Sequence, residues 1–144
     1  MISVVWKDGM TFEANVPSGN GFVMDGSPAI GGRDLGPTPM EAFLSAAAAC
    51  SAIDVLAILQ KKRQDVASYH VEVEWQRAPE GHYPRPVVSM VIRHVVSGEG
   101  IDAVAVQKAV ELSDQKYCSV LATLRHAPPV LSEFRIEETR RESA

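Results

Sequence analysis

The chain has 144 residues, of which 46% are hydrophobic and 22% charged, and its formal net charge is −4 at pH 7. This length and composition are typical of one soluble globular domain over residues 1–144, large enough to bury a core without disulfide bonds. The net negative charge and the scattering of charges disfavour a nucleic-acid or membrane-surface binder, because such proteins usually carry a basic patch.

The chain termini and the longest apolar run bear on the compartment. The N-terminus lacks the basic start and apolar stretch of a secretory signal, so a cytoplasmic protein is expected, in which any disulfide would be transient. The apolar run 42–59 is long enough to raise the question of a membrane span. Asp54 inside it and its alanine-rich composition favour a buried helix instead. The mixed-charge tail, residues 137–142, is expected to be solvated.

In chain order, the first predicted element is a β-hairpin. Residues 2–6 and 10–16 flank Asp8-Gly9, a pair that supplies the positive φ angles of a tight turn. A short third strand is predicted over residues 22–25. Three strands alone form a weak sheet that needs covering, and a partner subunit in an intertwined dimer could provide that cover.

A glycine- and proline-rich loop, residues 26–37, precedes a long predicted helix. Thr38 is a suitable N-cap, a proline follows it, and Glu41 completes a Thr-x-x-Glu capping box. The helix is predicted to run to about Lys62 and is apolar almost all round, which indicates a central core helix. Its alanine run, residues 46–49, permits the close approach of another backbone.

The second half of the chain is predicted to alternate between strands and one helix. Alternating apolar residues predict strands over 70–75 and 87–96. Asp102 can cap a second helix, whose helical spacing of apolar residues continues to Leu124. Residues 130–137 are predicted to form a last strand. The order β-β-β-α-β-β-α-β, with antiparallel groups and two core helices, indicates the α+β class.

Cys50 and Cys118 are the only cysteines, and each lies in an apolar stretch with helical patterning. They are either an inert pair of core residues, the common fate of free cysteine, or a dithiol that cycles through a disulfide. The pair gains functional weight only if the two thiols meet in space. Cys50 lies about three turns into its helix, beyond the reach of the helix dipole, so a reactive thiolate there needs a nearby cation or hydrogen-bond donors.

Charged residues near the first cysteine supply one candidate cation and one acid. Arg33 lies in the Gly-Gly-Arg loop that leads into the cysteine helix, although the commoner fate of such a residue is to be solvated and paired, here with Asp34. Asp54 lies one turn beyond Cys50 on about the same face. A carboxylate there disfavours a thiolate, so Asp54 is expected to cap or bridge structure. The four histidines lack the close spacing of a zinc site, and no metal site is expected.

Several of these segments together resemble the OsmC/Ohr family, the osmotically inducible protein C and organic hydroperoxide resistance proteins. The likeness rests on the helix start 36–44, the alanine run to Cys50, the downstream segment 117–120 and the Gly-Gly-Arg loop. Residues 50–55 look more like the YhfA-type branch of the family. The resemblance implies an OsmC-like fold, in which antiparallel sheets wrap two long central helices in an intertwined homodimer with active sites at the subunit interface.

The resemblance also implies a cysteine-based thiol peroxidase, an oxidoreductase that reduces organic hydroperoxides in oxidative stress defence. Cys50 would attack the peroxide and become a sulfenic acid, and Cys118 would resolve it as an intramolecular disulfide. An external dithiol would restore the thiols, and no other cofactor is expected. Arg33 would match the loop arginine that steadies the thiolate and polarises the peroxide.

The fourth candidate catalytic residue, Glu41, departs from the pattern of the organic hydroperoxide branches. There the glutamate directly follows the proline at the helix start, ten residues before the first cysteine, where this chain has Met40. At about 100° per residue, Glu41 lies roughly 180° from Cys50 around the helix and Met40 only about 80° away. Helix capping therefore ranks above catalysis for Glu41. The alternative function is a non-catalytic, stress-associated dimer that acts as a redox sensor or binds a small apolar ligand.

Overall fold

The computed structural model describes residues 1–137, in which two antiparallel sheets and three α-helices account for the regular structure. The elements are β1 (Ser3–Asp8), β2 (Thr11–Asn15), β3 (Phe22–Met24), a 3₁₀ turn η1 (Pro28–Ile30), α1 (Pro39–Lys61), β4 (Asp65–Arg77), β5 (Val87–Glu99), α2 (Ala103–Leu112), a π-helical turn η2 (Ser113–Tyr117) and α3 (Ser119–Arg125). The α+β class is confirmed. The predicted charged tail lies outside the described residues except for its first residue.

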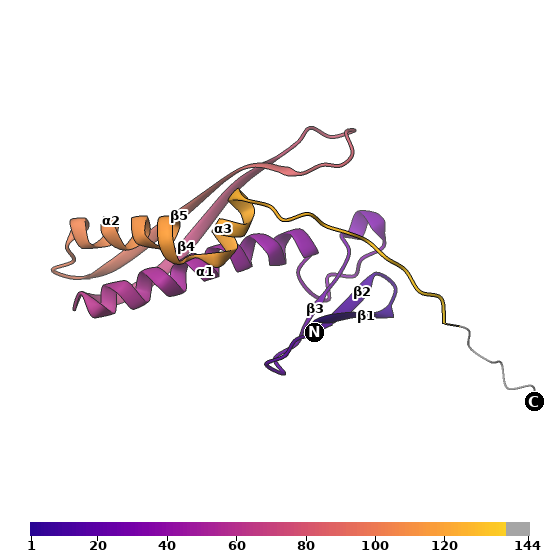
Figure 1. Cartoon of the computed structure of the whole chain (residues 1–144), viewed down its shortest axis with the longest axis horizontal. Helices are drawn as coiled ribbons and strands as arrows, with labels where there is room; N and C mark the ends of the chain where they lie inside the picture. Colours follow the sequence, from indigo (N-terminus) through magenta and orange to yellow (C-terminus); the bar gives the residue numbers. More distant parts are fainter. Residues whose placement is uncertain (138–144) are drawn as a thin grey trace, which may run out of the picture.

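The N-terminal sheet has the strand order β1-β2-β3, and all its strands are antiparallel. Gly9 at the predicted turn has φ +54°, a left-handed conformation that glycine adopts without steric cost. The predicted hairpin and third strand are therefore confirmed. This sheet lies at the N-terminal end of α1, away from α2 (Figure 1).

One buried carboxylate organises the loop between β3 and α1. Asp25 accepts hydrogen bonds from the backbone N–H groups of Gly26 at 2.8 Å, Arg33 at 2.8 Å and Leu35 at 3.2 Å. The loop folds so tightly that a Cβ atom at Gly32 would lie 1.6 Å from the Gly26 carbonyl oxygen. This packing fixes where the Gly-Gly-Arg loop enters α1.

Helix α1 begins as predicted, with a complete capping box. The Thr38 hydroxyl accepts from the Glu41 backbone N–H, and the Glu41 carboxylate accepts from the Thr38 backbone N–H. The helix packs against β4, α2 and α3 and carries both buried apolar clusters of the described chain. By length and hydropathy α1 could also cross a membrane, a test that core helices of soluble proteins pass as well.

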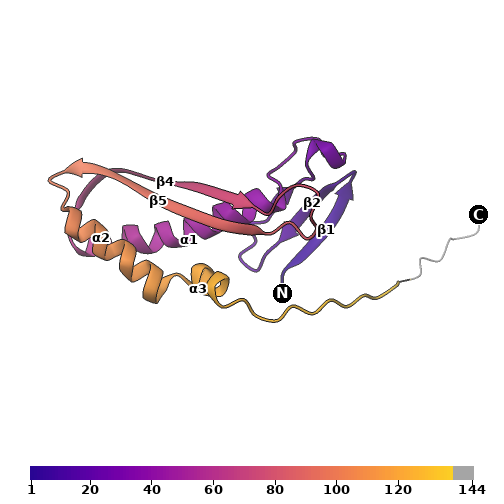
Figure 2. The ribbon, with the colours of Figure 1, turned by 90° about the horizontal axis from the view of Figure 1, so that it is seen from above.

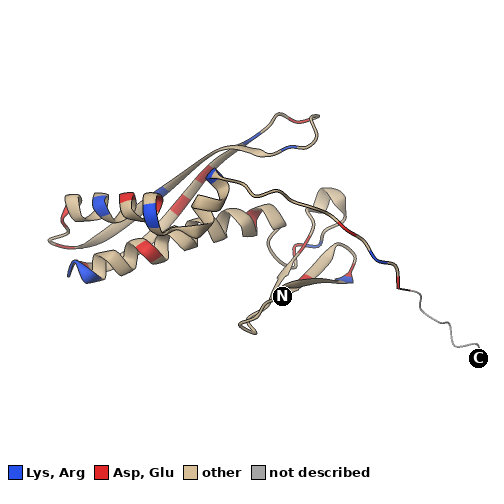
Figure 3. Ribbon diagram, in the orientation of Figure 1, with Lys and Arg blue, Asp and Glu red and all other residues tan. Residues whose placement is uncertain are grey.

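Strands β4 and β5 form a long antiparallel hairpin that runs alongside α1 (Figure 2), and residues of α2 and α3 share buried apolar clusters with both α1 and the hairpin. Both strands extend beyond their predicted ends, because ladder pairing continues through residues whose side chains do not alternate in polarity. Positive and negative residues are mixed over the described ribbon (Figure 3). This distribution agrees with the scattered charge noted in the sequence.

The second predicted helix is not continuous, which corrects the expectation of one helix from Asp102 to Leu124. Asp102 caps α2 by accepting from the Val104 backbone N–H at 3.0 Å, as predicted. After α2 the chain widens into the π-turn η2, and Cys118 adopts an extended conformation as the N-cap of α3. The apolar spacing does not reveal the break, because each piece keeps its apolar face toward α1.

The predicted last strand, residues 130–137, does not pair with another strand in the described chain. It runs extended away from α3 (Figure 1), and four of its apolar side chains are at least 80% exposed. These are Val130, Leu131, Phe134 and Ile136. A strand needs a neighbouring strand for its hydrogen bonds, and this single chain supplies none here.

Candidate functional site

The two cysteines meet where the middle of α1 packs against the break between α2 and α3. The sulfur atoms of Cys50 and Cys118 and a carboxylate oxygen of Asp54 all lie within 4.8 Å of one another. Both cysteines are free thiols. The condition that the sequence left open, whether the thiols meet in space, is therefore met.

Small and apolar residues bring the thiols together. Ala47, one turn before Cys50 on α1, has no exposed surface and packs against Cys118 and Leu121. An alanine at this position lets α3 approach the α1 backbone closely. Cys118 is buried at the helix break, whereas Cys50 is only half-buried.

The surroundings of Cys118 favour its protonated form. Burial raises the pKa of the Cys118 thiol, and hydrogen bonding to the Cys50 side chain raises it further. Backbone N–H groups at the start of α3, those of Leu121 and Val120, act in the opposite direction. Cys118 is therefore a proton-bearing thiol at neutral pH.

A hydrogen-bonded chain of buried and half-buried polar side chains ends at the same carboxylate. The Tyr69 hydroxyl lies 2.6 Å from His94 Nδ1, and His94 Nε2 lies 3.3 Å from Ser51 Oγ. Ser51 Oγ lies 3.2 Å from Ser113 Oγ, which donates to Asp54 Oδ2 at 3.3 Å. Ser51 and Ser113 have no exposed surface. These hydrogen-bonded side chains come from four elements, β4, β5, α1 and η2.

Burial sets the protonation of the two ring groups in this chain. Desolvation raises the pKa of Tyr69 to about 12, so its hydroxyl keeps its proton. Desolvation lowers the pKa of His94, and the nearby Asp114 carboxylate opposes this only in part. His94 is therefore a neutral imidazole at pH 7, with one N–H donor and one acceptor nitrogen.

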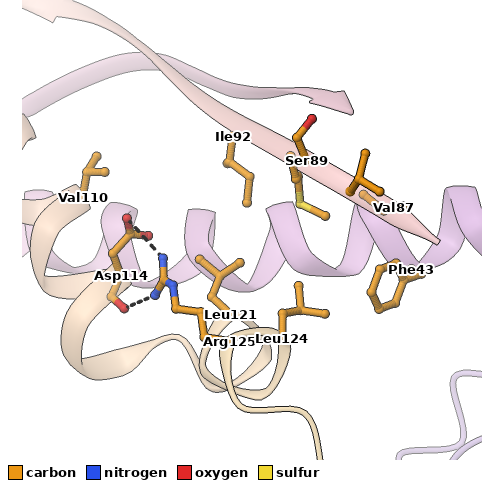
Figure 4. Close-up of a pocket in the computed structure, with 11 residues that line it drawn as sticks. Phe43, Val87, Ser89, Ile92, Val110, Asp114, Leu121, Leu124 and Arg125 are labelled. Carbon is orange, nitrogen blue, oxygen red and sulfur yellow. Dashed lines mark hydrogen bonds and ion pairs between the residues drawn. The ribbon is translucent and has the colours of Figure 1, made fainter. Parts of the chain in front are cut away.

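A cavity of about 540 Å³ (Figure 4) lies next to the apolar cluster around Cys118, and neither cysteine lines it. Three of its lining residues, Met90, Ile92 and Leu121, also pack in the cluster around Cys118. Its charged residues are Asp114 and Arg125. Their ion pair spans 3.7 Å, and Arg125 also donates to the Asp114 backbone carbonyl at 2.6 Å. The rest of the lining is mostly aliphatic or aromatic, so the cavity suits an apolar molecule.

The other two predicted site residues have their contacts elsewhere in the described chain. Arg33 is half-exposed over the β1–β2 turn and pairs with Asp8 at 3.1 Å. Glu41 is exposed and bonded in the capping box. Met40, at the position of the family glutamate, lines a separate cavity of about 530 Å³ between the N-terminal sheet and the start of α1. The catalytic roles of Arg33 and Glu41 stay predictions.

Comparison with known proteins now identifies the family. The profile of the OsmC-like protein family matches residues 31–133. The chain belongs to the OsmC-like family. It is 39% identical over 133 residues to protein YhfA of Escherichia coli K12, an alignment that covers 92% of this chain and 95% of YhfA.

Solved structures of other proteins share the fold. A hypothetical protein from Aquifex aeolicus VF5 is 28% identical with a TM-score of 0.75, over 88% of this chain and 87% of that one. The organic hydroperoxide resistance protein OsmC of Legionella pneumophila is 13% identical with a TM-score of 0.60, over 87% and 89% of the two chains. At that identity the second likeness shows the fold alone.

The OsmC-like site contains groups that sequence reasoning did not assign to it. Asp54 was expected to bridge structure, and it does so through Ser113, but it also faces both thiols.

Ser51, Ser113, His94 and Tyr69 were missed because their contacts join distant segments of the chain. One signal was available: His94 alternates with Ile92 and Val96 along β5, so it shares the inward face of that strand.

Proposed function

We propose that this OsmC-like protein is a cysteine-based thiol peroxidase that reduces organic hydroperoxides, with Cys50 as the attacking thiol and Cys118 as the resolving thiol. The observation that carries the proposal is the meeting of the two thiols within 4.8 Å, although they lie far apart in the sequence. A protein in a reducing compartment gains no permanent disulfide from such a pair, so the pair is better suited to a transient one.

The accessibility of the two thiols supports this choice of roles. Cys50 is half-buried and can meet a substrate, whereas Cys118 is buried and protonated. The Cys50 sulfur attacks one peroxide oxygen, the O–O bond breaks, and a sulfenic acid and an alcohol form. The Cys118 sulfur then attacks the sulfenic sulfur, which forms the disulfide and releases water. The Cys50–Cys118 pair supplies both electrons that reduce the hydroperoxide. An external dithiol then reduces the protein disulfide.

The apolar cavity next to the cluster around Cys118 supports organic over inorganic hydroperoxides. Its aliphatic lining can bury the alkyl part of a substrate, at roughly 0.8 kcal/mol for each CH₂ group, whereas hydrogen peroxide offers no such group. The solved OsmC relative of Legionella pneumophila is described as an organic hydroperoxide resistance protein, which agrees with this substrate class.

A cytoplasmic homodimer is part of the proposal. The exposed apolar residues of 130–137 and of the N-terminal sheet are surfaces that a second copy could cover. At such an interface Arg33 would leave Asp8 and stabilise the Cys50 thiolate.

The test is consumption of cumene hydroperoxide by the reduced protein with excess dithiothreitol, followed as hydroperoxide loss. Wild type should turn over, and Cys50→Ser should fall to the background rate. Cys118→Ser should complete one attack and accumulate a sulfenic acid that dimedone traps. Ser119→Ala, an exposed neighbour of Cys118, is the matched control and should behave as wild type. Background turnover by folded wild type would refute the proposal.

A second candidate is a redox sensor or a binder of a small apolar ligand. It is favoured by the pairing of Arg33 with Asp8, by the engagement of Glu41 in the helix cap, and by the cavity that Met40 lines. A sensor would form the Cys50–Cys118 disulfide after one equivalent of peroxide without turnover, which mass analysis under non-reducing conditions detects. A ligand binder would leave both thiols slow to react with a thiol reagent.

A further inference from the structure

Of the donor and acceptor assignments open to this polar chain, one directs every hydrogen bond toward Asp54. The protonated Tyr69 hydroxyl donates to His94 Nδ1, which leaves the imidazole proton on Nε2 to donate to Ser51 Oγ. The Ser51 hydroxyl then donates to Ser113 Oγ, and the Ser113 hydroxyl donates to the Asp54 carboxylate. Every donor is thus aimed toward Asp54, and such aligned bonds polarise one another.

These hydrogen bonds also tie η2 to α1, because Ser113 Oγ lies 3.5 Å from the Ser51 backbone carbonyl oxygen, but packing alone would not need hydroxyl groups there. Two serines without exposed surface lie at positions on α1 and η2 where apolar residues would pack without the cost of burying hydroxyl groups. The hydrogen-bonded side chains also end at the two thiols, because Asp54 lies one helical turn after Cys50 and within 4.8 Å of both sulfurs. The carboxylate is therefore held in one orientation beside the dithiol.

The proposed reaction requires two proton transfers at this place. In the first step the Cys50 thiol loses its proton and the leaving alkoxide must gain one. In the second step the Cys118 thiol loses its proton and the hydroxide that leaves the sulfenic acid must gain one. A group that reaches both sulfurs can serve both steps and ends each step unchanged.

We propose that Asp54 is the proton-transfer group of the dithiol site, and that Ser113, Ser51, His94 and Tyr69 are positioning residues that hold its carboxylate toward the two thiols. This inference rests on the proposed thiol peroxidase function. Asp54 accepts the thiol proton as the sulfur attacks and delivers it to the oxygen that leaves, so the two steps convert a dithiol and a hydroperoxide into a disulfide, an alcohol and water.

Asp54→Asn separates proton transfer from simple electrostatics. The amide removes a negative charge beside the thiols, so the thiolate absorbance at 240 nm should rise at a lower pH than in wild type. An electrostatic role alone would then make the variant react faster. Loss of proton transfer should instead slow both sulfenic acid formation and disulfide closure, each by about 100-fold in single-turnover reaction with cumene hydroperoxide. Asp54→Glu, which keeps a carboxylate, should recover part of both rates.

The positioning residues are tested through the pH dependence of the two rates, sulfenic acid formation and disulfide closure. Ser113→Ala removes the bond to Asp54 and should lower both rates less than Asp54→Asn does, with a changed pH dependence between pH 5 and 9. The groups that titrate or carry charge around the chain are the two thiols, Asp54, His94, Tyr69 and the Asp114 that faces His94. Asp65→Asn, an exposed acid at the start of β4, is the control for an acid-to-amide change and should leave rates and profile unaltered.

The outcomes distinguish the two proposals. If wild type consumes hydroperoxide and folded Asp54→Asn is as fast or faster, the role of Asp54 is refuted and the peroxidase stands. If wild type itself does not turn over, the peroxidase proposal fails and this inference falls with it. If Asp54→Asn does not fold, as judged by circular dichroism, the comparison of Asp54→Glu and Ser113→Ala with wild type decides instead: unchanged rates and pH profile in both would overturn the inference.

Discussion

At the scale of single residues, the carboxylates of Asp25 and Asp54 perform two different tasks. Asp25 has almost no exposed surface and is saturated by backbone N–H groups, so it fixes a loop. Asp54 is only half-buried, has one hydroxyl partner and faces two thiols. The number of donors around each carboxylate therefore separates a structural acid from one that is free to exchange a proton.

Asp25 should make the protein sensitive to acid. The backbone N–H group of Arg33, followed by those of Leu35 and Gly26, holds the pKa of Asp25 below its ordinary value of 3.8, against the effect of desolvation. A lowered folded-state pKa contributes stability above the unfolded value, and this contribution is lost as pH falls through the folded pKa. The melting temperature of wild type should therefore drop below about pH 4.

Asp25→Asn provides the comparison for this acid sensitivity. The amide cannot accept the same three bonds, so the variant should melt lower at pH 7 and lose less on acidification to pH 3. Thermal melts of both proteins across this range measure the difference. Parallel melting curves at all pH values would show that Asp25 does not stabilise the loop through its charge.

At the scale of elements, the start of α1 is where a candidate catalytic role meets a structural one. Thr38 and Glu41 satisfy each other's backbone N–H groups, and this reciprocal arrangement accounts for a glutamate at position 41 without catalysis. The other end of the site depends on the π-turn η2, which places Ser113 and Cys118 toward α1. The start of α1 could be predicted from four neighbouring residues. The π-turn η2 could not, because it depends on packing against a distant helix.

Removing the helix cap should lower the stability of the protein and leave its hydroperoxide turnover unchanged. Thr38→Ala should lower the free energy of unfolding by about 1 kcal/mol. Because Thr38 and Glu41 share one capping box, the double variant with Glu41→Ala should lose less than the sum of the two single losses. Denaturant unfolding of the four proteins measures this coupling. Glu41→Gln keeps an acceptor oxygen, so a collapse of hydroperoxide turnover in this variant at unchanged stability would assign Glu41 to catalysis after all.

At the scale of the whole molecule, the described chain leaves much apolar surface uncovered. The extended segment 130–137 has no strand partner in the described residues, and the N-terminal sheet exposes Val4, Trp6 and Phe12. Soluble monomers rarely expose apolar surface on this scale. This exposed apolar surface is the reason for which we propose a homodimer.

We expect sedimentation of the full chain at micromolar concentration to give the mass of a dimer. Substituting Phe134 and Ile136 together by serine should shift the equilibrium toward monomer, because each buried apolar side chain contributes about 1.5–3 kcal/mol. Serine at His82 and Tyr83, in the exposed β4–β5 turn, is the control pair and should leave the mass unchanged. A wild-type chain that sediments as a monomer would contradict the proposed assembly.

Local chemistry determined a large part of this protein. The Asp8-Gly9 turn, the Thr38–Glu41 cap and the apolar α1 follow from neighbouring residues, because turns, caps and helical faces are set within a few positions. The same locality placed Asp54 on the face of Cys50 and supplied the residues that resemble the family.

Tertiary structure alone decided the rest. The break at Ser113–Cys118, the meeting of the two thiols and the chain from Tyr69 to Asp54 join α1, α2, α3 and the β4–β5 hairpin. Contacts between segments far apart in sequence depend on how whole elements pack, and no periodicity within one element encodes them. The last strand shows the same limit: its apolar pattern was visible, but a strand forms only where a second backbone pairs with it.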